Sequence, residues 1–290
     1  MKKIIPVYDI CTIDRSAYQD LLVERFTTYL DKHYTNLSRL HRHSFYHLVL
    51  FTSGKGSHTI DFEKYIIRPF QIYFMAPGQV HSWHFDDAVD GYIVHFNIEL
   101  FNTFLLRSDH IQQFEFFKGS TESSVVNVPV DIQSKIQNIF ESILSEIEGS
   151  YQNLDMIRVL LLQLFFQIDR CCVTRKQKNI PHQKLLMLNH FKQLIEKNFR
   201  LLKLPKEYAQ LMYITPNHLN ALCQEVIGKS AGELIRERII LEAKRLLTDA
   251  GIDVSEVAYD LAFQDNSYFT RFFKKYTGVT PEDFRKNISH

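Results

Sequence analysis

The chain has 290 residues, of which 45% are hydrophobic and 23% are charged, and its formal net charge is +1. This length allows two domains but excludes a large repeat array, and this composition excludes disorder over most of the chain. The total charge excludes a polybasic protein, although residues 184–290 hold 16 Lys and Arg against 13 Asp and Glu.

Cysteine use and hydropathy bear on where the protein works. The four cysteines are Cys11, Cys171, Cys172 and Cys223. They form no C-x-x-C pair and do not suggest a disulfide framework, so a reducing cytoplasm is expected. The most apolar segment, residues 159–168, is far shorter than the ~20 residues that span a bilayer, and Asp9 and Asp14 interrupt any signal-peptide core. We therefore expect a cytoplasmic protein with no membrane partner.

Short strands and turns dominate residues 41–97. The segment "HLVLFTSGKGSHTIDF" predicts a strand, a Gly-containing turn and a strand, and "QIYFMAPGQVHSWHF" predicts the same arrangement around Pro77 and Gly78. The segment "GYIVHFNI" predicts a further strand, and β-branched and aromatic residues are abundant throughout. Several strands at this spacing predict a sandwich or barrel.

An isoleucine stripe marks the change to helix after residue 130. Its members are Ile132, Ile136, Ile139, Ile143 and Ile147, at intervals of 4, 3, 4 and 4 that keep to one helical face. Pro129 and Asp131 suit the start of this helix, and a second helix is predicted over residues 154–170. Both helices could pack on the strands of the same chain, or the stripe could pair with its copy in a homodimer.

The segment "VTRKQKNIPHQ", residues 173–183, is polar, basic and interrupted by a proline, which is typical of a linker. It divides the chain into a first domain over residues 1–172 and a helical domain over residues 184–290.

Two segments fifty residues apart share one pattern: "TPNHLNALCQEVIGKSA" from Thr215 and "DNSYFTRFFKKYTGVTP" from Asp265. The expected core positions are Leu219, Leu222, Cys223 and Val226 in the first, and Phe269, Phe272, Phe273 and Tyr276 in the second. Thr215 and Asp265 suit the N-cap, and Gly228 and Gly278 suit the stop. A short helix is predicted before each, so the outline is a helix-turn-helix, twice.

The residues of the opposite faces are polar. Two such helices about one duplex turn apart, ~34 Å, could enter successive major grooves of DNA. Residues 184–290 resemble the DNA-binding domain of the AraC/XylS family of transcription regulators, in "HLNALCQEVIGKSAGELI" and "VSEVAYDLAFQDNSYFTRFFKKYTGVTPEDFR". The resemblance implies base-reading roles for Asn217, Asn220, Ala221 and Gln224, and for Asn266, Ser267, Thr270 and Arg271.

The chemistry of these side chains predicts different contacts. Arg271 can make a bidentate contact to guanine, and asparagine or glutamine can do so to adenine. Lys274 and Lys275 are expected to meet phosphates, which position the protein without specifying sequence. Ala221 departs from the family, which often has a long polar or basic side chain there; it offers a contact to a thymine methyl but no hydrogen bond.

Histidines gather in the first domain. His41, His43 and His47 share one strand face by alternation, and His81 follows the proline–glycine turn. About residues 20–120 resemble, more loosely, the cupin β-barrel that senses effectors in many AraC-family proteins. Three interpretations stay open: a transition-metal site of His41, His43 and His81, an organic-effector pocket, or histidines bonded within the barrel wall.

We expect an α+β multidomain fold, with an N-terminal cupin-like β-barrel and dimerisation helices, and a C-terminal all-α domain with two helix-turn-helix motifs. The expected function is a ligand-responsive, sequence-specific transcription activator, not an enzyme, without metal or cofactor. Its partners are double-stranded DNA, a small-molecule effector, a second copy of the chain and RNA polymerase. The expected effector residues are His41, His43, His47, Tyr46, His81, Trp83 and Tyr92. The alternatives are a cupin-type metal-binding enzyme and an effector-independent regulator.

The effector is expected to change how the barrel, an N-terminal arm of about residues 1–20, or the linker holds the DNA-binding domain. Such a switch requires that the effector favour one arrangement over another.

Overall fold

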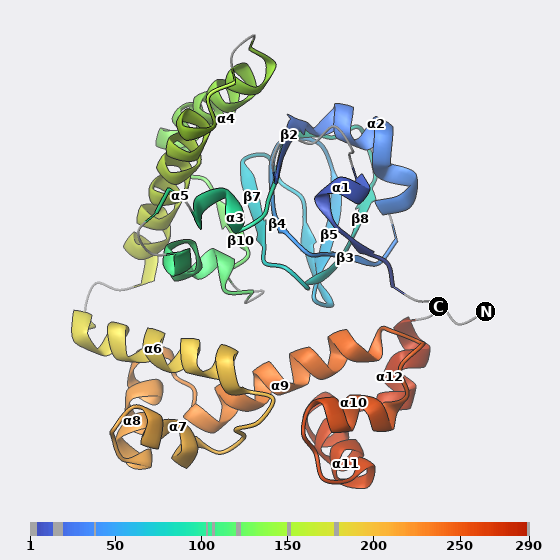
Figure 1. The fold of residues 1–290 in the computed structure, drawn as a ribbon, viewed down its shortest axis with the longest axis vertical. Coiled ribbons are helices and arrows are strands. Elements are labelled where there is room, and N and C mark those ends of the chain that lie inside the picture. The colour runs from blue at the N-terminus through green and yellow to red at the C-terminus, as the bar shows by residue number, and fades with distance from the viewer. Residues whose placement is uncertain are drawn as a thin grey trace. The chain divides into compact units, whose positions relative to one another are not determined.

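The computed structural model describes residues 5–13, 20–37, 39–102, 104–105, 108–119, 123–149, 152–176 and 180–288. The chain forms two compact units, of which one is Pro6–Lys176 and the other contains the helices from residue 182 onward (Figure 1). The predicted fold class, a sheet-rich N-terminal domain followed by an all-helical one, is confirmed. Residues 177–179 of the predicted linker lie outside the described residues, and its bounds, 173–183, stay a prediction.

The sheet-rich unit contains two five-stranded sheets. The first has the order β1 (Val7–Tyr8), β3 (His41–His43), β8 (Val80–Phe85), β5 (Gly56–Ile60) and β6 (Glu63–Ile66). The second has the order β10 (Val125–Asn127), β7 (Gln71–Met75), β4 (Tyr46–Ser53), β9 (Asp90–Phe96) and β2 (Leu21–Arg25). The shorter helical segments are α1 (Ile10–Ile13), α2 (Phe26–Leu37), α3 (Glu99–Asn102), η1 (Ser108–Gln113), η2 (Glu115–Phe117) and η3 (Val130–Ile132).

Alternation along the strands gives the second sheet two different buried faces. One face shares a core with the first sheet and α2, in which Val49 of β4 and Ile93 of β9 meet Trp83 of β8. The other face, with Leu48 and Val94, packs on α4 (Gln133–Glu148) and α5 (Leu154–Lys176). Because neighbouring residues of a strand point to opposite sides, this sheet separates two cores of different composition.

The isoleucine stripe belongs to the second of these cores. Ile136, Ile139 and Ile143 are 0%, 4% and 0% exposed and pack on the sheet and on α5 of the same chain. The interpretation of this stripe as a dimer interface is therefore wrong, because its side chains are already covered. The periodicity correctly predicted burial, but a buried face looks the same in sequence whichever surface covers it.

The helical unit has seven helices in its described residues. They are α6 (His182–Asn198), α7 (Pro205–Leu211), α8 (Pro216–Ile227), α9 (Ala231–Leu247), α10 (Val254–Asp260), α11 (Asn266–Thr277) and α12 (Pro281–Ile288). One apolar core joins them all, with aromatic residues concentrated around α11. In the described part of the chain, no helix combines the length and the apolarity needed to cross a membrane.

The two helix-turn-helix units repeat their backbone bonds as well as their sequence. The N–H of Ile214 donates to the carbonyl of Ala209, and the N–H of Phe263 donates to that of Ala258, 49 residues further on. From α8 to α11 the offset is 50, so the second turn is one residue longer.

Capping and stopping of α8 and α11 also match, as predicted. Thr215 and Asp265 accept the N–H groups of His218 and Tyr268 at 3.2 and 2.7 Å. Gly228 and Gly278 end the helices with φ of 69° and 82°, where a Cβ would meet no neighbouring atom. The requirement for glycine there is therefore conformational and not steric.

Tyr276 was predicted to be core, and that is wrong. Its side chain is 42% exposed, with one ring edge on Phe272 and the Arg236 guanidinium 5.1 Å from its centroid. It lies in the last turn of α11, where the apolar stripe of the helix continues beyond the residues that bury its earlier part.

A half-buried carboxylate connects the two halves of this unit. Glu242 of α9 lies 2.9 Å from Arg200, 3.0 Å from Arg238 and 3.9 Å from Arg245. Arg200, which follows α6, also pairs with Asp260 at the end of α10, at 2.6 Å. Burial alone would raise the pKa of Glu242, but the three arginines together lower it below its ordinary value.

We predict that Glu242→Gln destabilises the helical unit by about 1–3 kcal/mol at neutral pH, because three arginines lose their shared counter-charge in a partly dry site. Since the folded state lowers the pKa of Glu242, its contribution is present above the unfolded pKa of about 4.5 and is lost as pH falls through the folded value. The difference between parent and variant should therefore shrink on acidification. Urea unfolding followed by far-UV circular dichroism at several pH values measures it.

Glu237→Gln is the matched control, because Glu237 pairs with Lys229 on the surface and such pairs contribute about 0–1 kcal/mol. The fluorescence of Trp83, the single tryptophan of the chain, follows the sheet-rich unit and should not change. Equal destabilisation by both variants would contradict the role given to Glu242.

Candidate functional site

The exposed faces of α8 and α11 carry the predicted base-reading residues. On α8, Asn217, Asn220, Ala221 and Gln224 are all exposed. On α11, Asn266, Ser267, Arg271, Lys274 and Lys275 are exposed and Thr270 is half-buried. The structure thus brings each group together on one side of its helix, opposite the residues that enter the core.

The cations of α11 differ from two arginines elsewhere in this unit. Arg200 and Arg238 are held by carboxylates at 2.6–3.0 Å. Within the described residues, Arg271 and Lys274 have no ion-pair partner, and Lys275 lies 5.5 Å from the ring centroid of Tyr276. Unpaired cations on an exposed helix face are available to an anionic partner.

Asn220 has a structural contact that the sequence did not reveal. Its Oδ1 accepts the backbone N–H of Ala231 at 3.0 Å, which is one of the otherwise unpaired donors at the start of α9. A bidentate contact to adenine uses both the oxygen and the nitrogen of an asparagine amide. This bond therefore engages the oxygen that such a contact would need.

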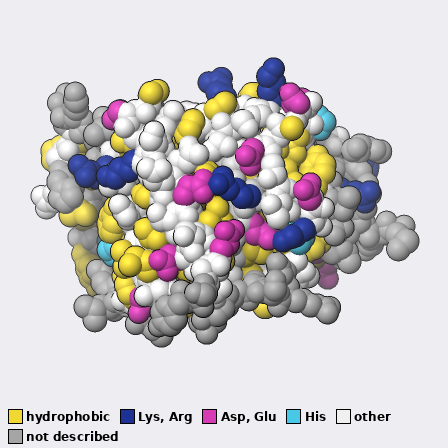
Figure 2. Space-filling view, turned by 90° about the horizontal axis from the view of Figure 1, so that it is seen from above, with side chains coloured by type: hydrophobic (Ala, Val, Ile, Leu, Met, Phe, Trp, Pro, Cys, Tyr) yellow, Lys and Arg dark blue, Asp and Glu magenta, His cyan; other side chains and the backbone are white. Residues whose placement is uncertain are grey.

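Two further exposed side chains occupy equivalent places on α8 and α11, and sequence reasoning missed them. His218 and Tyr268 are each the third residue of their helix and are both exposed, Tyr268 at 53%. Their positions next to Asn217 and Ser267 could have been read from the repeat. Figure 2, which views the molecule from above, shows a face on which positive and negative side chains are interspersed.

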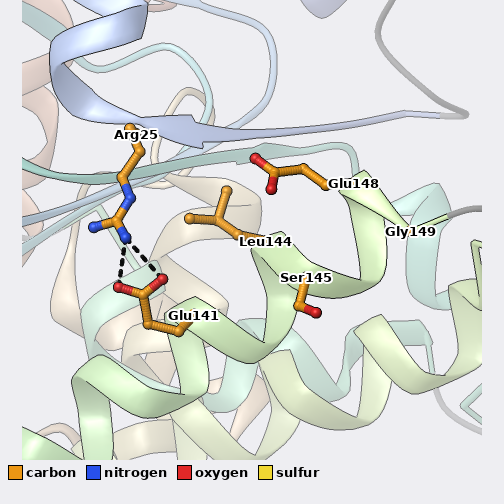
Figure 3. A pocket seen from close by; sticks show the side chains of 6 residues that line it. All are labelled: Arg25, Glu141, Leu144, Ser145, Glu148 and Gly149. Atoms are coloured by element: carbon orange, nitrogen blue, oxygen red, sulfur yellow. Dashed lines mark hydrogen bonds and ion pairs between the residues drawn. The ribbon is translucent and has the colours of Figure 1, made fainter.

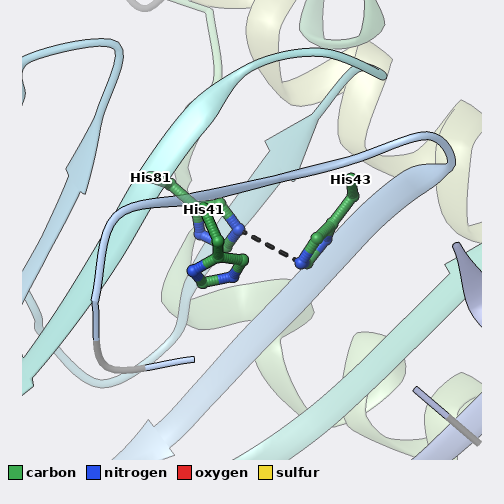
Figure 4. Close-up of side chains that lie close together, drawn as sticks. All are labelled: His41, His43 and His81. Atoms are coloured by element: carbon green, nitrogen blue, oxygen red, sulfur yellow. Dashed lines mark hydrogen bonds between the residues drawn. The ribbon is translucent and has the colours of Figure 1, made fainter. Parts of the chain in front are cut away.

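A second site lies between the two sheets, where six buried histidines meet. They are His41 and His43 of β3, His81 of β8, His58 of β5, His47 of β4 and His95 of β9, each 0–2% exposed. Strand pairing brings them together, since His41 is opposite His81 and His47 is opposite His95. Figure 4 shows the rings of His41, His43 and His81 facing one another.

The hydrogen bonds of this histidine cluster are mostly internal. His47 Nδ1 lies 2.9 Å from His95 Nε2, and His58 Nε2 lies 3.0 Å from His81 Nδ1. His58 and His95 were missed from the sequence, although alternation places each on the same strand face as an inward apolar residue, Ile60 and Ile93.

Burial keeps this cluster uncharged at neutral pH. It lowers the pKa of His41 to about 4 and that of His47 to about 3. It also lowers the pKa values of His43, His58, His81 and His95 well below the ordinary range, and repulsion between neighbouring imidazoles adds to the effect. The rings are therefore neutral donors and acceptors.

The predicted effector residues lie in two different cores of the sheet-rich unit. Trp83 lies beside the histidines, 5.4 Å from His81 between ring centroids, and its indole N–H has no partner. Tyr46 and Tyr92 instead belong to the core on the opposite face of the second sheet. Placing these two tyrosines with the histidines was wrong, because Tyr46 and His47 are consecutive strand residues and point to opposite sides.

A different feature is a surface hollow of about 340 Å³, which is lined by Glu141, the hydrogen-bond partner of Tyr92 (Figure 3). Arg25 of β2 donates two hydrogen bonds to Glu141 of α4, at 2.6 and 2.8 Å, and the Tyr92 hydroxyl donates to the same carboxylate. The hollow also meets Ser145 and Glu148. Because its central charges bind one another, this group fastens α4 to the sheet and offers little to a ligand.

Comparison with known proteins agrees with the division into two domains. A family model described as an AraC-like ligand binding domain matches residues 27–164, and one described as a helix-turn-helix domain matches residues 208–287. These ranges fall in the sheet-rich and the helical unit respectively.

Similar proteins extend over most of the chain. The arabinose operon regulatory protein of Salmonella typhimurium is 25% identical over 249 residues, which cover 83% of each chain. The transcriptional activator RhaR of Mannheimia succiniciproducens is 19% identical over 264 residues, or 89% of this chain and 90% of that protein. A solved structure of ToxT from Vibrio cholerae covers 92% of this chain and 98% of its own, with 14% identity and a TM-score of 0.44.

Both characteristic domains of one family are thus present in one chain, in order, with the exposed helices that DNA binding requires. The chain belongs to the AraC family of transcription regulators.

Proposed function

We propose that this regulator reads double-stranded DNA with α8 and α11 in successive major grooves and activates transcription in response to a small molecule. The observation that carries the proposal is that, among the residues the structure describes, Arg271 and Lys274 on the exposed face of α11 have no ion-pair partner, whereas Arg200 and Arg238 of the same unit do. Cations without an ion-pair partner in the protein can bind the phosphates and guanines of a duplex.

The two helices would read DNA unequally. Arg271 makes the bidentate contact to guanine, while Lys274 and Lys275 meet phosphates. On α8 the readers are Asn217, Gln224 and the Ala221 methyl. Asn220 contributes its amide nitrogen and positions the start of α9. Asn266, Ser267 and Thr270 complete the surface of α11 with short polar groups.

The small molecule would bind between the sheets, where His41, His43, His47 and His81 meet Trp83. Neutral imidazoles and an unpartnered indole N–H supply the few directed polar groups of a ligand site within an apolar core. As an activator working in the cytoplasm, the protein would contact RNA polymerase when bound to DNA, and it would act as a regulator and not as an enzyme.

A homodimer would form through α5 and not through the isoleucine stripe. Met156, Val159 and Phe166 of α5 are 44%, 48% and 47% exposed, and with the exposed Gln163 they follow the 3, 4, 3 spacing of a coiled-coil seam. An apolar stripe at this spacing on an exposed helix face fits a second copy of the same helix.

We expect Arg271→Ala to weaken binding to the preferred site by about 1–3 kcal/mol and to relax the preference at one base pair. Arg271→Lys keeps the charge but loses the planar fork, so it should keep most non-specific affinity and still lose the guanine preference. Selection of binding sites from random DNA measures both. An Arg271→Ala protein with the parent's affinity and site preference would refute the assignment.

Lys274→Ala should weaken binding to all sequences alike, because a phosphate contact carries no sequence information. The slope of log affinity against log salt should become shallower by about one. Lys197→Ala on α6, an exposed residue, makes the same charge change outside the reading helices and should alter neither quantity. A loss of affinity confined to one sequence would contradict the phosphate role.

The double variant Met156→Asp, Val159→Asp should be monomeric, because two carboxylates cannot be desolvated in an apolar seam. Sedimentation velocity at several protein concentrations measures this. Val130→Asp is the control, since Val130 is 84% exposed outside α5 and should leave association unchanged. A double variant that dimerises like the parent places the interface elsewhere.

A further inference from the structure

The histidine cluster leaves ring nitrogens unsatisfied in a place that water does not reach. A neutral imidazole has one N–H donor and one acceptor nitrogen, and buried polar atoms nearly always find partners. In the described part of the chain, five ring nitrogens of this cluster have no hydrogen-bond partner: His41 Nε2, His43 Nδ1, His47 Nε2, His58 Nδ1 and His95 Nδ1. A packing role alone would leave these buried polar nitrogens without partners, which a bound ligand would supply.

We propose that His41, His43 and His81 bind one divalent transition-metal ion of the class that zinc represents. Donor nitrogens of the three lie within 4.8 Å of one another, on two neighbouring strands of the first sheet (Figure 4). Imidazole nitrogen suits Zn²⁺, Cu²⁺, Ni²⁺ and iron. The set has no carboxylate, so it does not suit Mg²⁺ or Ca²⁺.

One distance distinguishes this set from an ordinary pair of hydrogen-bonded rings. His43 Nε2 and His81 Nε2 are 3.4 Å apart, which is beyond the usual 2.7–3.2 Å of a hydrogen bond to nitrogen. Two nitrogens at about 2.0–2.1 Å from a tetrahedral zinc ion are separated by about 3.3–3.4 Å. The two lone pairs are therefore spaced as ligands of one ion.

The outer contacts of His41 and His81 set the required tautomers of these two rings. His41 Nδ1 lies 2.7 Å from the Arg39 carbonyl oxygen. Because a carbonyl only accepts, His41 carries its proton on Nδ1, and its Nε2 keeps a free lone pair. His58 Nε2 can accept the Nδ1 proton of His81 in the same way. Metal-binding histidines usually have such a partner on the second nitrogen.

A second set, His43, His47 and His95, also brings three nitrogens together. In that set His47 Nδ1 and His95 Nε2 are 2.9 Å apart, which is the length of a hydrogen bond and too short for two ligands of one tetrahedral ion. This hydrogen bond engages His47 Nδ1 and His95 Nε2 with each other, so we assign the ion to the first set. His47 is then a neighbour of the site, 5.2 Å from His81 between centroids.

The low pKa values of the three imidazoles are consistent with this site. Since burial keeps His41, His43 and His81 unprotonated at neutral pH, the ion has no protons to displace. The sequence alone favoured a protein without metal, because it showed the residue types but not the spacing of their nitrogens. The inference concerns ion binding itself and stands apart from the DNA-binding function proposed above.

Titration of the chelator-treated full-length protein with Zn²⁺, in competition with a chromophoric chelator, tests the site. We expect one Zn²⁺ per chain, and affinity at least about 100-fold lower in His43→Ala and His81→Ala. His84→Ala is the control, since the side chain of His84 is 74% exposed beside Asp86, and it should bind like the parent. His58→Ala should cost about 10–100-fold, as a positioning residue.

Trp83 gives a second, independent readout. Its ring lies 5.4 Å from that of His81 and 6.1 Å from that of His41, so bound Co²⁺ should quench its emission with the same stoichiometry. Zn²⁺, but not Mg²⁺, should raise the melting temperature of the parent. These two measurements need only the parent protein, so a variant that fails to fold does not leave the site undecided.

Three results would overturn the proposal. The first is a parent protein that binds no stoichiometric Zn²⁺ and shows no quenching by Co²⁺. The second is loss of affinity in His84→Ala equal to that in His43→Ala, which indicates surface binding. The third is loss in His95→Ala with retention in His41→Ala and His81→Ala, which assigns the ion to the other set.

Discussion

The carboxylate of Glu242 is the interaction on which the geometry of DNA reading depends. It neutralises arginines from the end of α6 and from α9, and through Arg200 the network continues to Asp260 of α10. Because α10 precedes α11 by a tight turn, this chain of ion pairs relates the second reading helix to α9, which begins directly after the first. The spacing of major grooves is fixed by the duplex. If α8 and α11 moved freely relative to each other, they would lose conformational entropy on binding. Salt screens the Arg238–Glu242 pair, whose side chains are 15% and 14% exposed, less than the Arg200–Asp260 pair, whose side chains are 44% and 46% exposed.

Within this shared frame the two helices have diverged in charge. The site that holds Arg271 in α11 holds Ala221 in α8, and Lys275 corresponds to Glu225, which is bound by Lys184. In α8, the Asn220 Oδ1 also accepts a hydrogen bond from the backbone at the start of α9. In the proposed DNA-binding mode, affinity and its salt dependence would therefore come mainly from α11, while α8 would discriminate through neutral amides and a methyl group.

Local rules explain what could be predicted from the sequence. Caps at Thr215 and Asp265 and stops at Gly228 and Gly278 involve residues within one turn of each other, so a linear pattern reveals them. The isoleucine stripe showed burial, but its covering surface depends on strands far away in the chain. Tyr276 followed the helical period correctly and is exposed, because periodicity carries no information about where a neighbouring surface ends.

The histidine cluster shows the same limit at a functional site. Alternation alone could have separated Tyr46 from His47, and it could have added His58 and His95. It could not show that His43 and His81 meet at 3.4 Å, since that depends on strand order in a folded sheet.

The second sheet connects the two roles of the N-terminal unit. Along β4, His47 faces the cluster, while the residue before it, Tyr46, stacks on Phe96 and meets Phe117 in the core shared with α4 and α5. A ligand that shifts His47 must move the same stretch of backbone that carries Tyr46, because the two are joined by one planar peptide. Close-packed cores transmit such shifts instead of absorbing them. Occupancy between the sheets would therefore be coupled by packing to α5, whose exposed stripe is the surface proposed for a second copy of the chain.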